Sequence, residues 1–214
     1  MSIENRICDR LGTLYPNHDG SRLFERCKTA LGEPEVLTDS SKWSEQDAVL
    51  ICYPDQVVDD KRTSLRCLET ILQEMGEAFS TVHILPFFPS TSDGGFAVVD
   101  HHAVDEKLGS WDDISSIASN HQVMADLVLN HVSSSHRWVK EFRADVEPGR
   151  SCLKTASKLD DLSAVVRPRT SDLLVPCETA VGTRYLWCTF GPDQIDLDWS
   201  EFEVLIETLR VINV

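Results

Sequence analysis

The stretch that most constrains the fold runs from residue 81 to 131, because it holds two apolar runs that each end in polar residues. Val82–Phe88 leads into a loop rich in Pro, Ser, Asp and Gly, and Val123–Leu129 leads into an Asn-His pair. The stretch 111–120 between them has helical character. A strand, a long loop, a helix and a second strand form a βαβ unit of a parallel sheet. We therefore predict an α/β fold with polar residues gathered past the carboxyl ends of two strands, where such folds place their chemistry.

Further elements are predicted on both sides of this stretch. The short apolar run Ala48–Tyr53 is consistent with a buried parallel strand, and Thr63–Phe79 has leucines at helical spacing. Residues 1–32 predict two short amphipathic helices, broken at Tyr15–Gly20 by Pro, Asn, Asp and Gly. We interpret them as a structural cap on the outside of the main domain. A last helix is expected over Glu201–Ile212, where apolar residues again recur with a helical period.

The charge balance excludes some classes of partner. The chain has 214 residues, 42% hydrophobic and 26% charged, which suits one soluble globular domain or most of one. Its net charge is -15, which argues against unaided binding to nucleic acid or to an anionic membrane. A neutral sugar is compatible with such a surface, whereas a phosphate co-substrate needs local basic residues. The sequence does not determine the oligomeric state.

The cysteine pattern and the N-terminus predict a cytoplasmic protein. The seven cysteines are odd in number and show neither a CxxC pair nor a Cys/His zinc spacing, so we expect reduced thiols, several of them buried. The first residues contain no apolar core of signal-peptide length, and no run approaches the roughly 20 apolar residues of a membrane span.

Three phrases carry a family resemblance: LPFFPSTSDGGFAVVD, LGSWDDI and MADLVLNHVS. They resemble the α-amylase superfamily (glycoside hydrolase family 13), and within it the branch that contains sucrose phosphorylase and glucosylglycerate phosphorylase. The resemblance extends from about Trp43 to the last residue. It implies a (β/α)8 barrel that acts on an α-glucoside and inorganic phosphate, gives glucose 1-phosphate with retention, and needs no cofactor. KWSEQDAVLICYPDQ and DLSAVVRPR look more like the glucosylglycerate phosphorylase branch.

This resemblance also organises the chain into parts. A closed barrel of this type has eight strands, and only strands 1–3 are recognisable, so we expect an incomplete barrel, the N-terminal part of a longer enzyme. The segment from 132 to 193 has no clean period, and a structureless loop of that length is uncommon within a barrel. An inserted small domain after strand 3, as in the resembled family, resolves the conflict. The expected parts are then an N-terminal helical extension with linker (1–42), the first part of the barrel (43–131), the inserted domain (132–193) and the resumed barrel (194–214).

Asp93 and Phe96 lie in the SDGG loop after the second strand. From local sequence alone, Asp93 is a turn residue before glycines. The resemblance of the whole phrase implies instead that Asp93 binds hydroxyls of the glucosyl unit and that Phe96 forms an apolar wall of that pocket.

His131 directly follows the third strand, next to Asn130. A lone histidine is usually structural, but this position at the end of a barrel strand is typical of a functional group. The phrase D-x-V-x-N-H implies that His131 donates to a glucosyl hydroxyl and that Asp126 is its structural support. Calcium is held near the Asn position in many amylases, but no companion set of oxygen ligands is visible, so we predict no metal.

Arg167 and Arg169 lie two residues apart in the predicted insert, separated by Pro168 that favours an extended chain, so their side chains are expected to point the same way. They can form surface ion pairs in so acidic a protein, or they can bind phosphate through charge-assisted bonds. The resemblance favours phosphate, with Arg169 as the main ligand. It also implies that Phe190 and Gln194 line the leaving-group side of the site.

No catalytic carboxylate is assigned within the chain. Retaining enzymes of this class use a carboxylate nucleophile and a carboxylic acid, and the resembled family carries them on later strands, expected beyond Val214. Asp196 and Asp198 match the segment before a helix and not the nucleophile. Two alternatives stay open: an α-glucoside hydrolase of the same fold, or a truncated, non-catalytic fragment that is inactive alone.

Overall fold

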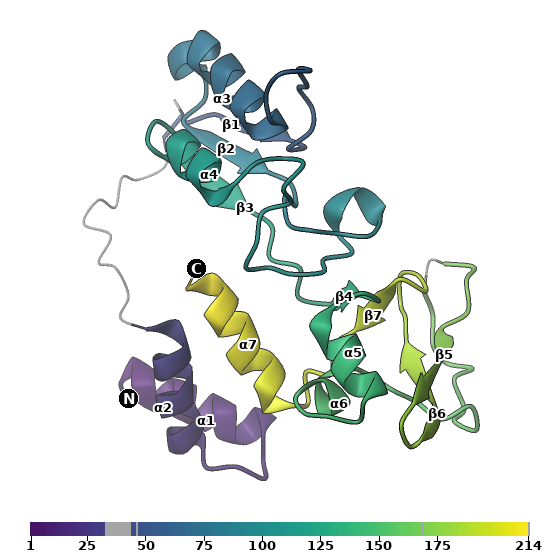
Figure 1. The fold of residues 1–214 in the computed structure, drawn as a ribbon. Helices are drawn as coiled ribbons and strands as arrows, with labels where there is room; N and C mark the ends of the chain where they lie inside the picture. Colours follow the sequence, from purple (N-terminus) through teal and green to yellow (C-terminus); the bar gives the residue numbers. More distant parts are fainter. Residues whose placement is uncertain (33–43, 46, 168, 214) are drawn as a thin grey trace. The chain divides into compact units, whose positions relative to one another are not determined.

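The computed structural model describes residues 1–32, 44–45, 47–167 and 169–213, so the predicted linker lies mostly outside the described residues. The chain forms two compact units. One contains the described residues up to Gly32 and those from Leu129 onward, and the other contains those between Ser44 and Val128 (Figure 1). Each unit is described separately below.

The unit in the middle of the chain contains a three-stranded parallel sheet in the order β1-β2-β3. Its strands are β1 (Val49–Cys52), β2 (Thr81–Ile84) and β3 (Gln122–Ala125). Helix α3 (Ser64–Met75), followed by the 3-10 helix η1 (Gly76–Ala78), connects β1 to β2. Helix α4 (Trp111–Ala118) precedes β3. The predicted βαβ arrangement is therefore confirmed.

Both helices pack on the same face of the sheet. Their apolar stripes bury a core against alternate strand residues; the main members are Leu65, Leu68, Leu72, Val82, Ile84, Phe87, Phe88, Ile114 and Ile117. Two-residue periodicity turns the next residues to the opposite face, where Val49 is 40% exposed, Ile51 61% and Met124 42%. The expectation that Ala48–Tyr53 is a buried strand is therefore wrong for one face, because only Leu50 and Cys52 pack toward the helices.

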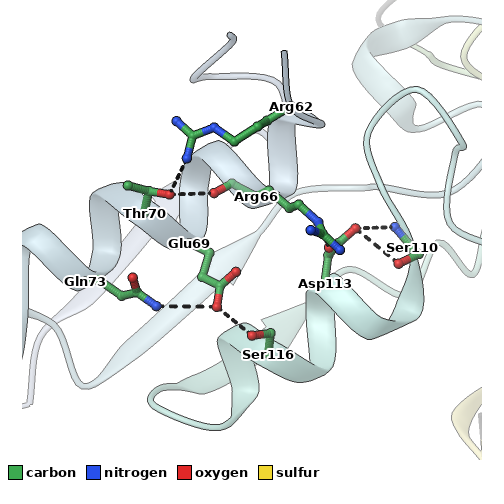
Figure 2. A network of polar contacts seen from close by, with 8 residues as sticks. All are labelled: Arg62, Arg66, Glu69, Thr70, Gln73, Ser110, Asp113 and Ser116. Atoms are coloured by element: carbon green, nitrogen blue, oxygen red, sulfur yellow. Dashed lines mark hydrogen bonds and ion pairs between the residues drawn. The ribbon is translucent and has the colours of Figure 1, made fainter.

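A polar network joins α3 to α4 and determines where α4 begins (Figure 2). Ser110 and Asp113 form a capping box, which satisfies backbone N–H groups that the first turn leaves unpaired. The carboxylate of Asp113 also accepts from Nε of Arg66 at 2.9 Å. One turn further along each helix, Ser116 donates to Glu69 at 2.5 Å. The network fixes the helix pair that supports β2 and β3.

The other unit begins with the predicted helical cap. Helices α1 (Ile3–Leu14) and α2 (Gly20–Leu31) confirm the two N-terminal helices, each capped at its start by a side chain, from Ser2 and Asp19 respectively. A Cβ at Gly20 would lie 2.1 Å from the carbonyl oxygen of Cys8, so only glycine permits this close approach of the two helices.

The N-terminal helices share a core with the last helix, α7 (Phe202–Ile212). The rings of Tyr15 and Phe202 meet edge to face with centroids 5.2 Å apart. Arg26 forms an ion pair with Glu203 at 2.6 Å and lies over the Phe202 ring. The cap and α7 therefore form one helical cluster within this unit.

The region without a clear sequence period resolves into short elements around a separate core. Strand β4 (His131–Ser133) pairs antiparallel with β7 (Gln194–Asp196), and β5 (Leu174–Thr179) pairs with β6 (Gly182–Trp187). Helices α5 (Arg137–Arg143) and α6 (Gly149–Cys152) lie between β4 and β5 in the chain. The β4–β7 ladder closes the segment expected as an insert.

Two predicted strands are too long. Strand β2 ends at Ile84 and not at Phe88, and β3 ends at Ala125 and not at Leu129. Pro86 has no N–H for a sheet ladder, and Phe87 and Phe88 are buried in the helix-facing core from a loop. Their apolar character therefore reflects core packing outside a strand.

Candidate functional site

The loop after β2 is held in a compact turn that presents Asp93. Backbone bonds close its base, with Val99 N–H donating to Pro89 O at 2.7 Å and Thr91 N–H donating to Ala97 O at 3.1 Å. Asp93 has φ 59 in the 3-10 helix η2 (Asp93–Gly95). Its side chain is exposed, and Phe96 is half-buried at the end of the turn.

The glycines that follow Asp93 are required by their surroundings. Gly95 has φ 102, and a Cβ there would lie 2.7 Å from the carbonyl oxygen of Pro86. A Cβ at Gly94 would lie 3.3 Å from the Tyr53 ring, which comes from the end of β1. The two glycines after Asp93 therefore let the turn lie against Tyr53 and Pro86, which follow β1 and β2 in the chain.

Within the same unit, a side-chain bond joins the ends of β2 and β3. His83 Nε2 lies 3.0 Å from Oδ2 of Asp126, and both side chains are partly buried. His83 pairs in register with Ile51 and Met124, whose side chains lie on the face away from the helices. The resemblance implied that Asp126 supports His131, whereas the bond seen here joins Asp126 to His83, which the sequence did not single out.

The other unit brings five predicted site residues together. His131 is the first residue of β4 and is 6% exposed. The amide nitrogen of Gln194 lies 3.0 Å from His131 Nε2, and the Phe190 ring is 5.2 Å from the imidazole, tilted by 53°. A neutral imidazole that accepts on Nε2 carries its proton on Nδ1. Gln194 and Phe190 thus orient the imidazole from two sides.

The two arginines take different positions beside this group. The guanidinium of Arg169 lies 5.7 Å over the Phe190 ring, a cation–π geometry. Arg167 is half-buried and donates from Nη1 to the carbonyls of Thr189 at 3.2 Å and Cys188 at 3.4 Å. Both side chains contact the segment 188–190. The part of the sequence prediction that concerns Pro168 lies outside the described residues.

Asp196 and Asp198 both have structural partners. The carboxylate of Asp196 accepts two hydrogen bonds from Thr189. Burial alone would raise the pKa of Asp198, but hydrogen bonds from Ser200 and Lys154 outweigh it and leave the pKa below its usual range. These contacts support the expectation that neither aspartate is the nucleophile.

Burial keeps Cys152 and Cys188 from being activated for nucleophilic chemistry. All seven are free thiols, and six of them are buried. Burial raises the pKa of Cys152 to about 12, with nearby glutamates adding to the effect, and burial raises that of Cys188 to about 12 as well. At neutral pH both therefore stay protonated, whereas the thiolate is the reactive form.

Two further searches concern metals and membranes. Within the described part of the chain, no group of three or more His, Cys, Asp or Glu side chains is arranged to hold a metal ion. Among the same residues, no helix combines the length and apolar character needed to cross a membrane.

The family model of the α-amylase catalytic domain matches residues 70–212. The chain therefore belongs to the α-amylase family, as its motifs predicted. It is 41% identical to a glucosylglycerate phosphorylase of Allomeiothermus silvanus, over 98% of this chain and 38% of the relative. It is 34% identical to a glucosylglycerate phosphorylase of Escherichia coli over the same shares.

A solved structure shows the same similarity in three dimensions. The crystal structure of sucrose 6F-phosphate phosphorylase from Thermoanaerobacter thermosaccharolyticum superposes with a TM-score of 0.70 at 28% identity, over 80% of this chain and 37% of that one. The α/β fold is therefore of the barrel type found in this family. The chain spans about 38% of the length of the curated relatives it matches.

Sequence reasoning missed Thr189, which bonds to Asp196 and Arg167 and directly precedes Phe190. A weak signal was present, since an aromatic residue, a threonine and a further aromatic residue precede the GPDQID segment. The bond between Thr189 and Asp196 could not be predicted, because a sequence does not show which residues lie close together in the fold.

Proposed function

We propose that this chain forms part of an α-glucoside phosphorylase, an enzyme that transfers a glucosyl unit from sucrose, sucrose phosphate or glucosylglycerate to inorganic phosphate. The product is glucose 1-phosphate, formed with retention. The observation that carries the proposal is the group made by His131, Gln194, Phe190 and Arg169, in a chain whose relatives include two glucosylglycerate phosphorylases.

Each residue of this group has a chemical role in the proposal. The imidazole of His131 donates to a glucosyl hydroxyl, and the contact with Gln194 orients the ring. Phe190 provides an apolar wall on the leaving-group side. Arg169 binds the phosphate, since a guanidinium forms charge-assisted bonds with phosphate oxygens. Arg167 anchors the loop that carries Arg169 by its bonds to backbone carbonyls.

For the unit with the parallel sheet, considered by itself, we propose that Asp93 and Phe96 bind a glucosyl unit. The supporting observation is a tight turn in which Asp93 adopts the left-handed backbone that aspartate tolerates, with its side chain exposed. An exposed carboxylate at this position can accept hydrogen bonds from two sugar hydroxyls.

The architecture fits three strands of a (β/α)8 barrel. Helices α3 and α4 cover one face of the parallel sheet, as the outer helices of a barrel do, and the other face carries exposed apolar side chains. We propose that the segment 132–193 is the inserted domain after strand 3. The nucleophile and the acid/base carboxyl group are proposed to lie in the part of the family's length that this chain does not span.

The test is to join residues 1–214 to the remaining part of the Allomeiothermus silvanus relative. The joined protein is incubated with phosphate and either glucosylglycerate or sucrose, and glucose 1-phosphate and free glucose are measured. We expect phosphate-dependent glucose 1-phosphate from the joined protein and none from the 214-residue chain alone.

Two arginine variants make this experiment specific. Arg169→Gln should raise the KM for phosphate about tenfold or more, because one charge-assisted contact accounts for roughly 1.5–3 kcal/mol. Arg22→Gln removes an equal charge at an exposed position of α2, and it should leave the KM for phosphate unchanged. Release of free glucose without phosphate dependence would instead establish a hydrolase and refute the proposal.

A further inference from the structure

A relay of hydrogen bonds connects β6, the turn after it and β7. The indole N–H of Trp187 donates to the hydroxyl oxygen of Thr189 at 3.1 Å. Because that oxygen accepts from the indole, its own proton points to Asp196 Oδ2, 2.6 Å away. The backbone N–H of Thr189 donates to the other oxygen, Oδ1, at 3.0 Å. Both carboxylate oxygens of Asp196 therefore accept a hydrogen bond from Thr189, and we call this pair of bonds the Thr189–Asp196 clamp.

Asp196 is itself held in place by its strand and by its burial. Asp196 ends β7, is 8% exposed and pairs in register with His131 on β4. Its own carbonyl oxygen accepts from Lys154 N–H at 2.8 Å. A carboxylate buried to this degree is stable only with hydrogen-bond partners, and Thr189 supplies two of them.

The clamp acts on the residues of the proposed phosphate site. Phe190 follows Thr189 directly, so fixing the backbone at 189 fixes where the Phe190 ring begins. That ring contacts both the His131 imidazole and the Arg169 guanidinium. The carbonyl of Thr189 is also an acceptor for Arg167. Thr189 therefore contacts Arg167 directly through its carbonyl, and it supports Arg169 indirectly through the ring of the next residue, Phe190.

We propose that Asp196 and Thr189 are positioning residues, which place the Phe190 ring and through it the Arg169 guanidinium for binding phosphate. The inference rests on the proposed function, because it assigns the support of that same site. Neither residue touches substrate: the pair acts through the aromatic ring.

Thr189→Val tests the hydroxyl, since valine keeps the shape and the backbone N–H bond but removes the contact to Asp196 Oδ2. Thr189→Ser restores the hydroxyl and is the matched control. The probe is inorganic phosphate, titrated into the 214-residue chain and followed by NMR on the Nε–Hε signal of Arg169. The ring current of Phe190 shifts this signal, and Phe190→Leu gives its value without the ring.

We expect Thr189→Val to weaken phosphate binding about tenfold, because it removes two hydrogen bonds that hold the turn before Phe190, the one from Trp187 and the one to Asp196. We also expect its Arg169 signal to move toward that of Phe190→Leu, with Thr189→Ser unchanged in both. Asp196→Asn should act in the same direction and carries the test if the valine variant does not fold.

A lower melting temperature with an unchanged Arg169 signal and unchanged affinity would show that the clamp only stabilises the fold, which would overturn the inference. Absence of phosphate binding by the unmodified chain would refute the proposed phosphate site instead. The ring-current shift in Thr189→Val would then still decide whether Thr189 positions Arg169.

Discussion

Asp113 offers the sharpest test of how the parallel sheet is held together. Its carboxylate is 6% exposed and has three partners: Ser110 N–H at 2.8 Å, the Ser110 hydroxyl at 3.1 Å and Arg66 Nε at 2.9 Å. The substitution Asp113→Asn keeps the shape of the side chain but removes its charge. The neighbouring Asp112→Asn is the matched control, because Asp112 lies in the same helical turn and is exposed.

The expected loss of unfolding free energy follows from the hydrogen-bond partners that an asparagine at position 113 can keep. Its single oxygen can stay on the Ser110 side, which places the amide group opposite Arg66. The Arg66 side chain is 64% exposed and becomes hydrated, so losing that pair costs about 1 kcal/mol or less. The weakening of two buried bonds from charged to neutral adds roughly 1 kcal/mol. We therefore expect a total of about 2 kcal/mol for Asp113→Asn and less than about 0.5 kcal/mol for Asp112→Asn.

The measurement must report on one unit, because two compact units need not unfold together. Native-state amide hydrogen exchange, resolved on peptides of α4 and β3, provides this. A loss of about 2 kcal/mol corresponds to roughly thirtyfold faster exchange in those peptides. Equal exchange in the two variants would show that the capping box and its ion pair do not stabilise this helix.

Three further changes are predicted. A double-mutant cycle of His83→Phe and Asp126→Asn should give a coupling free energy of about 1 kcal/mol from exchange in β2 and β3, and a value near zero would contradict the bond between them. Iodoacetamide at pH 8 should modify the half-exposed Cys8 while Cys188, whose pKa burial raises to about 12, stays unmodified until denaturant is added; mass spectrometry of peptides decides this. Because the pKa of Asp198 is lowered in the folded state, its stabilising contribution is present above the unfolded pKa of about 3.9 and disappears as pH falls through the folded value. Asp198→Asn should therefore flatten the acid limb of a melting-temperature profile, and an unchanged limb would refute the assignment.

The elements that the sequence predicted well are those with a complete local signal. Helices α1, α2, α3 and α7 each show an apolar stripe at helical spacing, and caps or glycines mark several of their ends. Strand ends were harder to predict, because the burial of Phe87 and Phe88 in the core depends on helices far away in the sequence. The short elements between β4 and β7 are too brief for a period to appear.

The candidate site shows the same division between local and distant information. The motif around Asp93 was readable because its turn is encoded by adjacent glycines. The contacts of His131 with Gln194 and Phe190 join residues about sixty positions apart, so single-sequence reasoning could select these residues but could not place them together. The β4–β7 ladder shows why these residues are close in space, because it pairs His131 with Asp196 on neighbouring strands.

The two arginines show why residue type alone cannot assign a phosphate ligand. Arg167 and Arg169 are identical in chemistry and differ by two positions, yet one bonds to backbone carbonyls and the other lies on an aromatic ring. A guanidinium that bonds to carbonyls holds a loop in place, and moving it to a ligand would break those bonds. A guanidinium over a ring face is held by a cation–π contact, whose strength does not depend on which partners its N–H groups bond to. The proposed division of roles therefore rests on the different contacts of the two guanidinium groups, and Thr189 links them through its carbonyl and its neighbour Phe190.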